Sequence, residues 1–257
     1  MRDYLDAMHE DAAIDPEQRV RETSKRELPK RFYERAEHVE ADGGFAIHLD
    51  GRPVKTPGKS TLTLPTAVLG AAVAAEWDAQ EKEIDPARMP LTRISNSAQD
   101  AVAAKFDEVA DEITNFAGND ALCYRADTPD SLVTSQRTTW DPVVDWAGDL
   151  LGGRFLLIEG IIHAAQPDSL LTAFRARIGV LTPLKLAAFH TATSLTGSAL
   201  LALALLEEHL GSEGVWKAAH VEEDFNIERW GEVTEATEIR AFKQKEFEAA
   251  TLILAKG

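Results

Sequence analysis

The part of the chain with the most chemical potential is an acidic stretch in its last quarter. Between Glu207 and Glu238, ten acidic residues stand against two basic ones, Lys217 and Arg229. Carboxylates alternate there with large apolar side chains, as in Asp-Phe-Asn-Ile-Glu-Arg-Trp-Gly-Glu over residues 224–232. Such a density of like charge repels itself, and a basic or polar partner surface would relieve the repulsion. On composition alone, a solvated helix face is the simpler interpretation.

A divalent metal site is the first chemistry that this stretch could support. His220 and Asp224 are four residues apart, which places both on one face of a helix, and Glu223 and Glu228 are close by. Metal sites of this kind need a third ligand at a defined spacing, and none follows in a recognisable pattern. The chain also lacks the nucleophile-elbow, zincin and dinucleotide-binding motifs. We therefore predict no catalytic residues, no metal and no cofactor, and keep a metal-dependent enzyme built on the acidic cluster as the alternative.

A nucleotide site is not supported either. Residues 58–60, Gly-Lys-Ser, resemble the end of a phosphate-binding P-loop, whose pattern requires an upstream glycine with four residues between it and the final Gly-Lys pair. The nearest upstream glycine, Gly51, leaves six residues in between, and Pro53 and Pro57 remove backbone N–H donors that would hold phosphate. We expect a surface hairpin loop that binds no nucleotide.

Charge and cysteine content exclude further classes. The net charge of −16 argues against nucleic acid as the main partner, because phosphate binding needs a basic surface. It argues equally against anionic membrane surfaces. The single cysteine, Cys123, rules out an internal disulfide framework, and its apolar neighbours predict a buried thiol.

One apolar segment is long enough to be compared with a membrane span. Residues 186–206 carry no formal charge, but a third of them are polar, whereas spans are predominantly apolar over about 20 residues. We predict a buried central helix without membrane insertion. Residues 1–22 carry seven acids, which is unlike a transit peptide, and we expect a cytoplasmic, bacterial protein.

Residues 31–65 predict a small antiparallel sheet. Strand formers over 32–39 are followed by a turn at 42–44, and residues 45–49 alternate with three apolar side chains on one face. Asp50-Gly51 is a typical hairpin turn, because glycine permits a positive φ. We expect the return strand over 52–56 and another short strand over 61–64.

Helices are expected to pack against this sheet. Thr66 can cap a helix whose apolar face includes Leu69, Val73 and Trp77. A regular apolar stripe predicts a second helix over 98–116, capped by one of the polar residues 95–97, and residues 121–125 predict a further strand.

The second half of the chain predicts helices only. Asp141-Pro142 and Thr182-Pro183 each suggest an N-cap followed by proline at the first helical position. The expected helices begin at these two points and at Asp168, the one from Pro183 running to Leu206, and two more cover 215–229 and 232–254. The fold class is therefore α+β: a charged tail or arm at 1–30, a small antiparallel sheet with helices at 31–127, and a helical C-terminal domain at 128–257.

Tryptophan positions separate core from surface candidates. Trp77 and Trp140 stand beside apolar positions and are assigned to the core, where an indole buries about 150–250 Å². Trp230 stands before Gly231 at an expected helix end, between two glutamates. Core packing and an exposed contact both remain open for Trp230, because tryptophan is enriched at interface hot spots.

A family resemblance covers roughly residues 32–240. Residues 228–235, Glu-Arg-Trp-Gly-Glu-Val-Thr-Glu, resemble the C-terminal motif of the Atp12 family, assembly chaperones of the F1 ATP synthase. Six further blocks resemble the family in the same order: Leu-Asp-Gly-Arg-Pro-Val-Lys-Thr-Pro at 49–57, Glu-Trp-Asp within 75–80, Met-Pro-Leu-Thr at 89–92, Cys-Tyr-Arg-Ala at 123–126, Trp-Asp-Pro at 140–142 and Gly-Ser-Ala-Leu-Leu at 197–201. Each block is weak alone, and their order makes the resemblance specific.

The resemblance implies a function without catalysis. A protein of this family binds the unassembled F1 α subunit, prevents its aggregation and releases it when the β subunit takes the same surface. Within the matching blocks, the resemblance points first to Glu232 as a client contact. The expected client-binding residues are Asp224, Phe225, Glu228, Trp230, Gly231 and Glu232. The match weakens after Glu235, and the sequence leaves the oligomeric state and the affinity for the client open.

Overall fold

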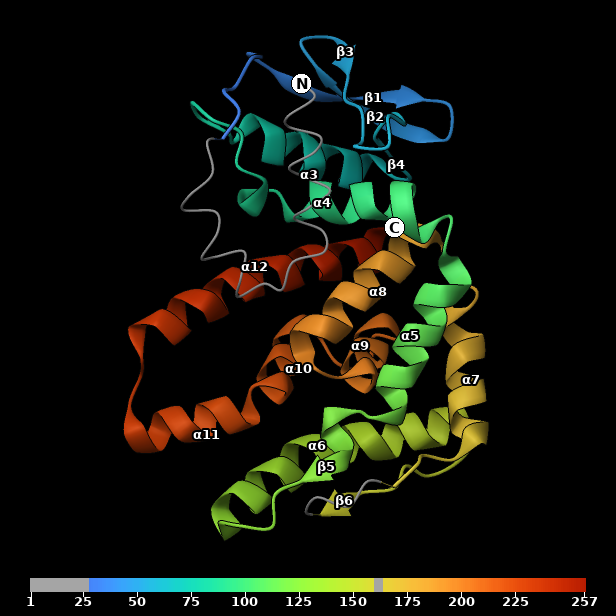
Figure 1. Cartoon of the computed structure of the whole chain (residues 1–257), viewed down its shortest axis with the longest axis vertical. Coiled ribbons are helices and arrows are strands. Elements are labelled where there is room, and N and C mark those ends of the chain that lie inside the picture. Colours follow the sequence, from blue (N-terminus) through green and yellow to red (C-terminus); the bar gives the residue numbers. More distant parts are fainter. Residues whose placement is uncertain (1–27, 160–163) are drawn as a thin grey trace. The chain divides into compact units, whose positions relative to one another are not determined.

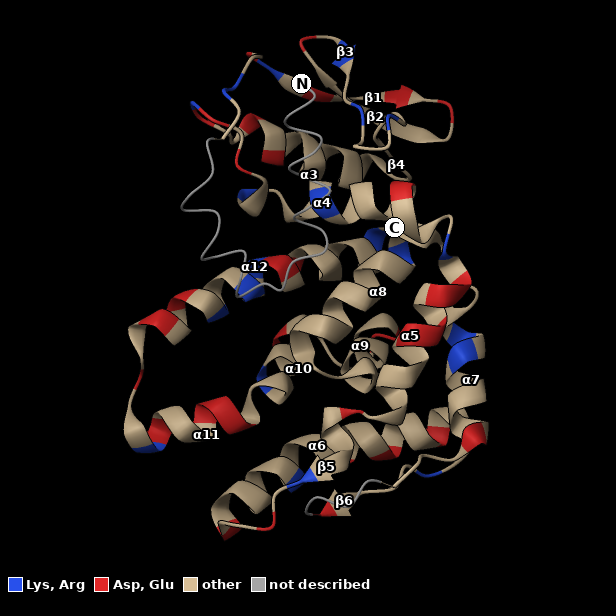
Figure 2. Cartoon of the chain, viewed as in Figure 1, with Lys and Arg blue, Asp and Glu red and all other residues tan. Residues whose placement is uncertain are grey.

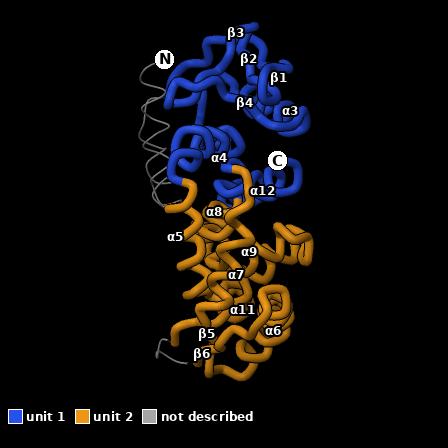
Figure 3. The backbone as a smooth tube through the Cα atoms, turned by 90° about the vertical axis from the view of Figure 1, so that its right-hand side faces the viewer, with its two compact units in different colours: residues 1–105, 183–188, 241–257 blue, residues 106–182, 189–240 orange. Residues whose placement is uncertain are grey.

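The computed structural model describes residues 28–159 and 164–257, so the arm expected at 1–30 lies outside the described residues except for its last three. By contacts, the chain divides into two compact units, coloured separately in Figure 3. Unit 1 comprises Met1–Lys105, Pro183–Ala188 and Ala241–Gly257, and unit 2 comprises Phe106–Thr182 and Phe189–Arg240. The domain boundary expected at 127/128 stays a prediction.

The elements follow one another as the α+β class requires (Figure 1). Unit 1 contains β1 (Ala36–Ala41), β2 (Gly44–Leu49), β3 (Arg52–Pro53), β4 (Thr63–Leu64), α3 (Ala67–Asp78), η1 (Pro86–Arg88), α4 (Pro90–Ser97) and η2 (Ala98–Val102). Unit 2 contains α5 (Phe106–Gly118), η3 (Ala121–Cys123), β5 (Tyr124–Arg125), α6 (Asp130–Leu151), β6 (Ile158–Glu159), α7 (Asp168–Ile178), α9 (Ala199–Leu206), α10 (Ser212–Ala219) and α11 (Val221–Trp230). Two helices, α8 (Pro183–Thr196) and α12 (Thr234–Lys256), contribute residues to both units.

The antiparallel sheet of unit 1 confirms the predicted hairpins. β2 pairs with β1 over the register Ala36↔Leu49 to Ala41↔Gly44, and also with β3 and β4. Asp50 and Gly51 connect β2 and β3 with φ values of 48° and 76°, the positive angles that the turn requires. The first strand begins at Ala36 and not at Phe32, and the backbone N–H groups of Glu34 and Arg35 donate to the Asp50 carboxylate instead of to a neighbouring strand.

Helix α3 covers the sheet as expected. The Thr66 hydroxyl accepts the backbone N–H of Leu69 and so provides the predicted cap. Trp77 is 1% exposed, which confirms its assignment to the core, and its carbonyl accepts the Tyr33 hydroxyl at 2.6 Å. Gly70 allows the close approach of α3 to β1 and β2, because a Cβ at this position would lie 3.0–3.1 Å from side-chain carbons of Phe45 and His38.

Glu76 joins α3 to the beginning of α4. Its carboxylate accepts the backbone N–H groups of Leu91 and Thr92 at 2.7 and 2.8 Å and the Thr92 hydroxyl at 2.7 Å. These are N–H groups of a first helical turn, which have no partner inside the helix. Burial outweighs the three hydrogen bonds and raises the pKa of Glu76 to about 7.

A pH-dependent stability follows from Glu76. Because its folded-state pKa lies above the unfolded value of 4.5, the folded state binds the additional proton, and the associated stability falls as pH rises from about 4.5 to about 7. We expect the free energy of unfolding of the wild type, relative to Glu76→Gln, to be about 3 kcal/mol higher at pH 4.5 than at pH 8. Urea unfolding of both proteins across this range measures the difference. A difference that does not change with pH would contradict the assignment.

The prediction of a single helix over 98–116 is wrong about where that helix begins. Residues 95–97 do not cap it, since they lie inside α4, which runs into the π-helical turn η2 before a new helix begins at Phe106. Within η2, the Asp100 carboxylate accepts the Thr56 hydroxyl at 2.7 Å and the Gly58 N–H at 2.6 Å. The Gly-Lys-Ser loop thus uses the Gly58 donor within unit 1. The strand expected over 121–125 is mostly the 3₁₀ turn η3, and only Tyr124 and Arg125 pair, with β6.

Pro142 does not open a helix. It lies inside α6, a single helix of 22 residues. An internal proline costs about 3 kcal/mol through the lost hydrogen bond and the ring clash. The buried face of α6 offsets this cost, because Trp140, Val143 and Val144 are all nearly inaccessible, and the Trp140 indole donates to the Ala218 carbonyl at 2.8 Å. Trp140 is therefore a buried residue of unit 2.

The long apolar helix expected up to Leu206 is two helices. Gly197 adopts a φ of +67° and ends α8, and the Ser198 hydroxyl accepts the N–H of Leu201 to cap α9. The fully buried Asp120 accepts the next free donor, the N–H of Leu200, at 2.9 Å, and burial raises the pKa of Asp120 to about 6. α9 is buried along nearly its whole length, as predicted, and no helix among the described residues is long and apolar enough to cross a membrane.

Three further expectations concern Cys123, Asp168 and the helix over 215–229. The Cys123 thiol is buried, as predicted, and burial raises its pKa to about 12. Asp168 is the first residue of α7, preceded by Pro167 without a side-chain cap, so it does not act as the expected N-cap. The helix expected over 215–229 is divided at His220 into α10 and α11.

The end of α12 belongs to unit 1 by its contacts. Glu246 of α12 forms a buried ion pair with Arg93 of α4, and both side chains are less than 10% exposed. The Thr66 hydroxyl donates to the Lys256 carbonyl at 3.0 Å. The N-terminal sheet region and the last turns of the chain therefore share one core.

Candidate protein-binding surface

The candidate surface is formed by α11 and the beginning of α12 in unit 2. α11 ends where Gly231 adopts a φ of +83° and donates its N–H to the Ile227 carbonyl at 2.8 Å. A residue with a side chain adopts this conformation only with strain. Gly231 therefore reverses the chain between the two helices and places its neighbours on an exposed turn.

Two large apolar side chains flank this turn. Trp230 is 75% exposed and Val233 is 65% exposed. The structure thus decides the open question about Trp230: it is a surface residue. Val233 was missed by the sequence analysis, although its position next to the expected turn was a signal for exposure.

The surroundings of this apolar pair are acidic. Glu228, Glu232, Glu235 and Glu238 are all exposed, and Figure 2 shows the acidic segments along α11 and at the turn to α12. Within the described residues, Glu228 and Glu232 enter no ion pair within 4.0 Å. An apolar centre with a charged, solvated rim is the usual arrangement of a protein-binding surface.

Two of the six expected contact residues are partly engaged inside unit 2. Asp224 accepts a hydrogen bond from Arg240 of α12 at 2.5 Å, which ties α11 to α12. The Phe225 ring is covered by the Arg229 guanidinium, whose carbon lies 4.4 Å from the ring centroid, and Arg229 also donates to Ser131 of α6. We place Asp224 and Phe225 at the base of the surface, and Glu228, Trp230, Gly231 and Glu232 at its exposed part.

The described residues offer no ligand set for the alternative function, a metal-dependent enzyme. No group of three or more His, Cys, Asp or Glu side chains in the part of the chain that the structure describes could hold a metal ion. His220 is buried, with its Nδ1 2.7 Å from the Trp216 carbonyl oxygen to which it donates, and burial lowers the pKa of the imidazole. His220 is thus a helix-junction residue in this arrangement.

Comparison with known proteins identifies the family. A family model described as ATP12 chaperone protein matches residues 30–148. The crystal structure of Atp12 from Paracoccus denitrificans has 37% identity and a TM-score of 0.81, over 88% of this chain and 97% of that chain. The chain belongs to the ATP12 chaperone family. The predicted resemblance and the α+β fold class are both confirmed.

Two further similarities extend over most of this ATP12 chaperone. The structure of Atu1473, a putative chaperone from Agrobacterium tumefaciens, shares 43% identity and a TM-score of 0.86, over 99% of this chain and 96% of that one. The Schizosaccharomyces pombe protein named Protein atp12, mitochondrial, is 25% identical over 239 residues, which are 88% of this chain and 82% of that protein. The family model ends at residue 148, so the candidate surface rests on the geometry of α11 and α12 and not on that match.

Proposed function

We propose that this ATP12 chaperone binds the unassembled α subunit of F1 ATP synthase, prevents its aggregation and releases it when the β subunit takes the same surface. The family membership supports the role of an assembly chaperone. The resemblance of the sequence to assembly chaperones supports the choice of client. The observation that carries the binding surface is the exposed pair Trp230 and Val233 within a rim of carboxylates.

The physical task of such a chaperone is to cover an apolar subunit interface that has no partner yet. Binding to the native-like subunit lowers the concentration of free, aggregating subunit by mass action, and no nucleotide hydrolysis is required. A few large side chains supply most of the energy at such interfaces, and tryptophan is prominent among them. A cytoplasmic location stays a prediction.

The first test is aggregation of refolding F1 α subunit without nucleotide. We expect light scattering to fall when the wild-type chaperone is added, and to fall less with Trp230→Ala, because the variant loses the most exposed aromatic contact. Isolated F1 β subunit serves as the control client and is expected to scatter equally with and without the chaperone. Equal scattering of the α subunit in both conditions would contradict the proposed client.

Glu232→Lys tests the rim separately from the fold. Since Glu232 is exposed, we expect the free energy of unfolding to change by no more than about 0.5 kcal/mol, and the melting temperature to change little. Binding of the α subunit should weaken, and its dependence on salt should change, because the reversed charge would meet like charge across the interface. Glu81→Lys, an equally exposed reversal outside α11 and α12, is the matched control. Wild-type binding by Glu232→Lys at both low and high salt would remove this residue from the contact surface.

A further inference from the structure

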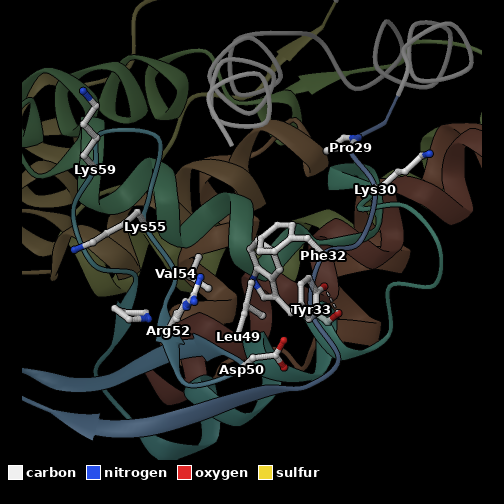
Figure 4. A pocket seen from close by; sticks show the side chains of 12 residues that line it. Pro29, Lys30, Phe32, Tyr33, Leu49, Asp50, Arg52, Val54, Lys55 and Lys59 are labelled. Carbon is white, nitrogen blue, oxygen red and sulfur yellow. Dashed lines mark hydrogen bonds between the residues drawn. The ribbon is translucent and has the colours of Figure 1, made fainter.

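Unit 1 contains a pocket of about 930 Å³ between the segment before β1, the β2–β3 turn and the end of α3. We call it the β3 pocket. Its floor is formed by Tyr33, Leu49, Val54 and Trp77, all of them buried. Phe32, 62% exposed, stands at its side with its ring edge-on to Tyr33 at 5.4 Å (Figure 4). The volume is near the upper end of the range for ligand pockets.

The rim of the β3 pocket is basic. Lys30, Arg52, Lys55 and Lys59 line it, all exposed, against the single carboxylate of Asp50. Figure 4 shows Lys55 and Lys59 on one side of Phe32 and Lys30 on the other. Four cations around one opening contrast with a chain of net charge −16. Among the described residues, Lys30, Arg52 and Lys59 have no carboxylate within 4.0 Å.

The Asp50 carboxylate offsets only part of the positive charge of this rim, since it is one anion against four cations. It accepts the backbone N–H groups of Glu34 and Arg35, which lower its pKa, and it thereby holds the segment before β1 against the turn. Lys55 is partly engaged, since its Nζ donates to the Thr61 hydroxyl at 2.8 Å. Arg52 and Lys59, both from the segment that begins with β3, are two rim cations that form no ion pair among the described residues.

The chemistry of the pocket favours a peptide over a phosphate compound. Phosphate sites depend on several convergent backbone N–H groups. Here Pro29 and Pro53 have no N–H to offer, and the N–H of Gly58 is bound to Asp100. An apolar floor with charged side chains around it matches instead the core and rim of a protein interface.

We propose that the β3 pocket binds an extended segment of a partner protein in which a large apolar side chain is flanked by carboxylates. The apolar side chain packs on Tyr33, Val54 and Phe32, and the carboxylates pair with Arg52 and Lys59. The chaperone then has two recognition surfaces of opposite charge, one in each unit: the acidic α11–α12 surface and the basic β3 pocket. This assignment depends on the geometry of unit 1 and not on which F1 subunit is the client.

The test is fluorescence anisotropy with the full chain and a labelled nine-residue peptide. The peptide has one central phenylalanine, two glutamates on each side and glycine elsewhere. We expect saturable binding that weakens as salt rises. A peptide with lysine in place of glutamate, and one with alanine in place of phenylalanine, are expected to bind at least about tenfold more weakly. Equal binding of the lysine peptide would overturn the proposal.

Charge reversal locates the binding on the protein. Arg52→Glu with Lys59→Glu is expected to weaken the acidic peptide at least about tenfold, because like charges then face each other. Lys82→Glu with Lys217→Glu makes the same change of net charge outside the pocket and is expected to bind like wild type. Melting temperatures of both double variants control for folding. Wild-type affinity in the pocket variant would overturn the assignment.

Two further measurements test for other ligands of the β3 pocket. Competition by ATP or inorganic phosphate at the peptide's own concentration would show a general anion site and overturn the proposal. A gain in peptide affinity on replacing Asp3, Asp6 and Glu10 by Asn or Gln in the full chain would identify the chain's own acidic N-terminal segment as the occupant, and would also overturn it. No competition and no gain support a partner segment.

Discussion

Trp77→Ala is expected to lower the free energy of unfolding by about 3–5 kcal/mol. The indole is 1% exposed, lies at the end of α3 and contacts the Tyr33 ring at a centroid distance of 5.9 Å. Its removal leaves a cavity that the surrounding sheet and helix fill only in part. The loss is a large share of the roughly 5–15 kcal/mol that a typical domain has in total. Chemical denaturation followed by circular dichroism measures it.

Trp230→Ala is the matched control for this experiment. The side chain is of the same type but 75% exposed, so its removal is expected to change stability by no more than about 0.5 kcal/mol. Client binding should respond in the opposite order, with the larger loss for Trp230→Ala. Similar destabilisation by the two substitutions would show that the assignment of one tryptophan to the core and the other to the surface is wrong.

Glu246→Ala is expected to cost a similar amount, about 3–5 kcal/mol, for an electrostatic reason. The substitution leaves the Arg93 guanidinium buried without its carboxylate, and a buried charge loses its hydration without compensation. The joint replacement Arg93→Met with Glu246→Leu removes both charges and is expected to recover most of the loss. A double-mutant cycle from urea unfolding measures the coupling.

An exposed pair provides the comparison. Arg154 and Asp149 form an ion pair in which both side chains are more than 60% exposed, and Asp149→Ala is expected to leave the unfolding midpoint nearly unchanged. A loss on Glu246→Ala no larger than that on Asp149→Ala would mean that the Arg93–Glu246 pair contributes no more than a surface contact.

Local signals were sufficient for much of the fold. The Asp50-Gly51 turn and the Thr66 cap could be predicted because each depends on the chemistry of one or two residues. Trp77 could be placed in the core because its apolar neighbours repeat with the helical period, and Trp140 because it stands beside apolar residues in the sequence. These features need no knowledge of distant parts of the chain.

Two of the wrong predictions have different physical causes. Pro142 has a strong local preference to begin a helix, but the buried face of α6 outweighs it. The break between α8 and α9 has a local signal, the positive φ of Gly197 and the Ser198 cap, and Asp120 adds a distant contact to Leu200, 80 residues later in the sequence. The continuous apolar run over 186–206 outweighed this local signal, so the sequence alone predicted one helix where there are two.

The candidate surface was only partly predictable. The acidic composition of α11 is visible in the sequence, but the exposure of Trp230 depends on how Gly231 turns the chain. Asp224 shows the converse: its carboxylate was expected to face the client, yet it pairs with Arg240 sixteen residues later. The β3 pocket could not be foreseen, since its floor and rim come from three separate segments.

The Arg93–Glu246 pair also bears on biosynthesis. The two residues are 153 positions apart, and at a translation rate of about 5–20 residues per second Arg93 is made roughly 8–30 s before its partner. The interval is longer still between Thr66 and Lys256, whose carbonyl accepts the Thr66 hydroxyl. The sheet and α3 are made early, but Arg93 of α4 lacks its Glu246 partner until α12 has been made. The nascent chaperone therefore completes unit 1 only after α12 has been made.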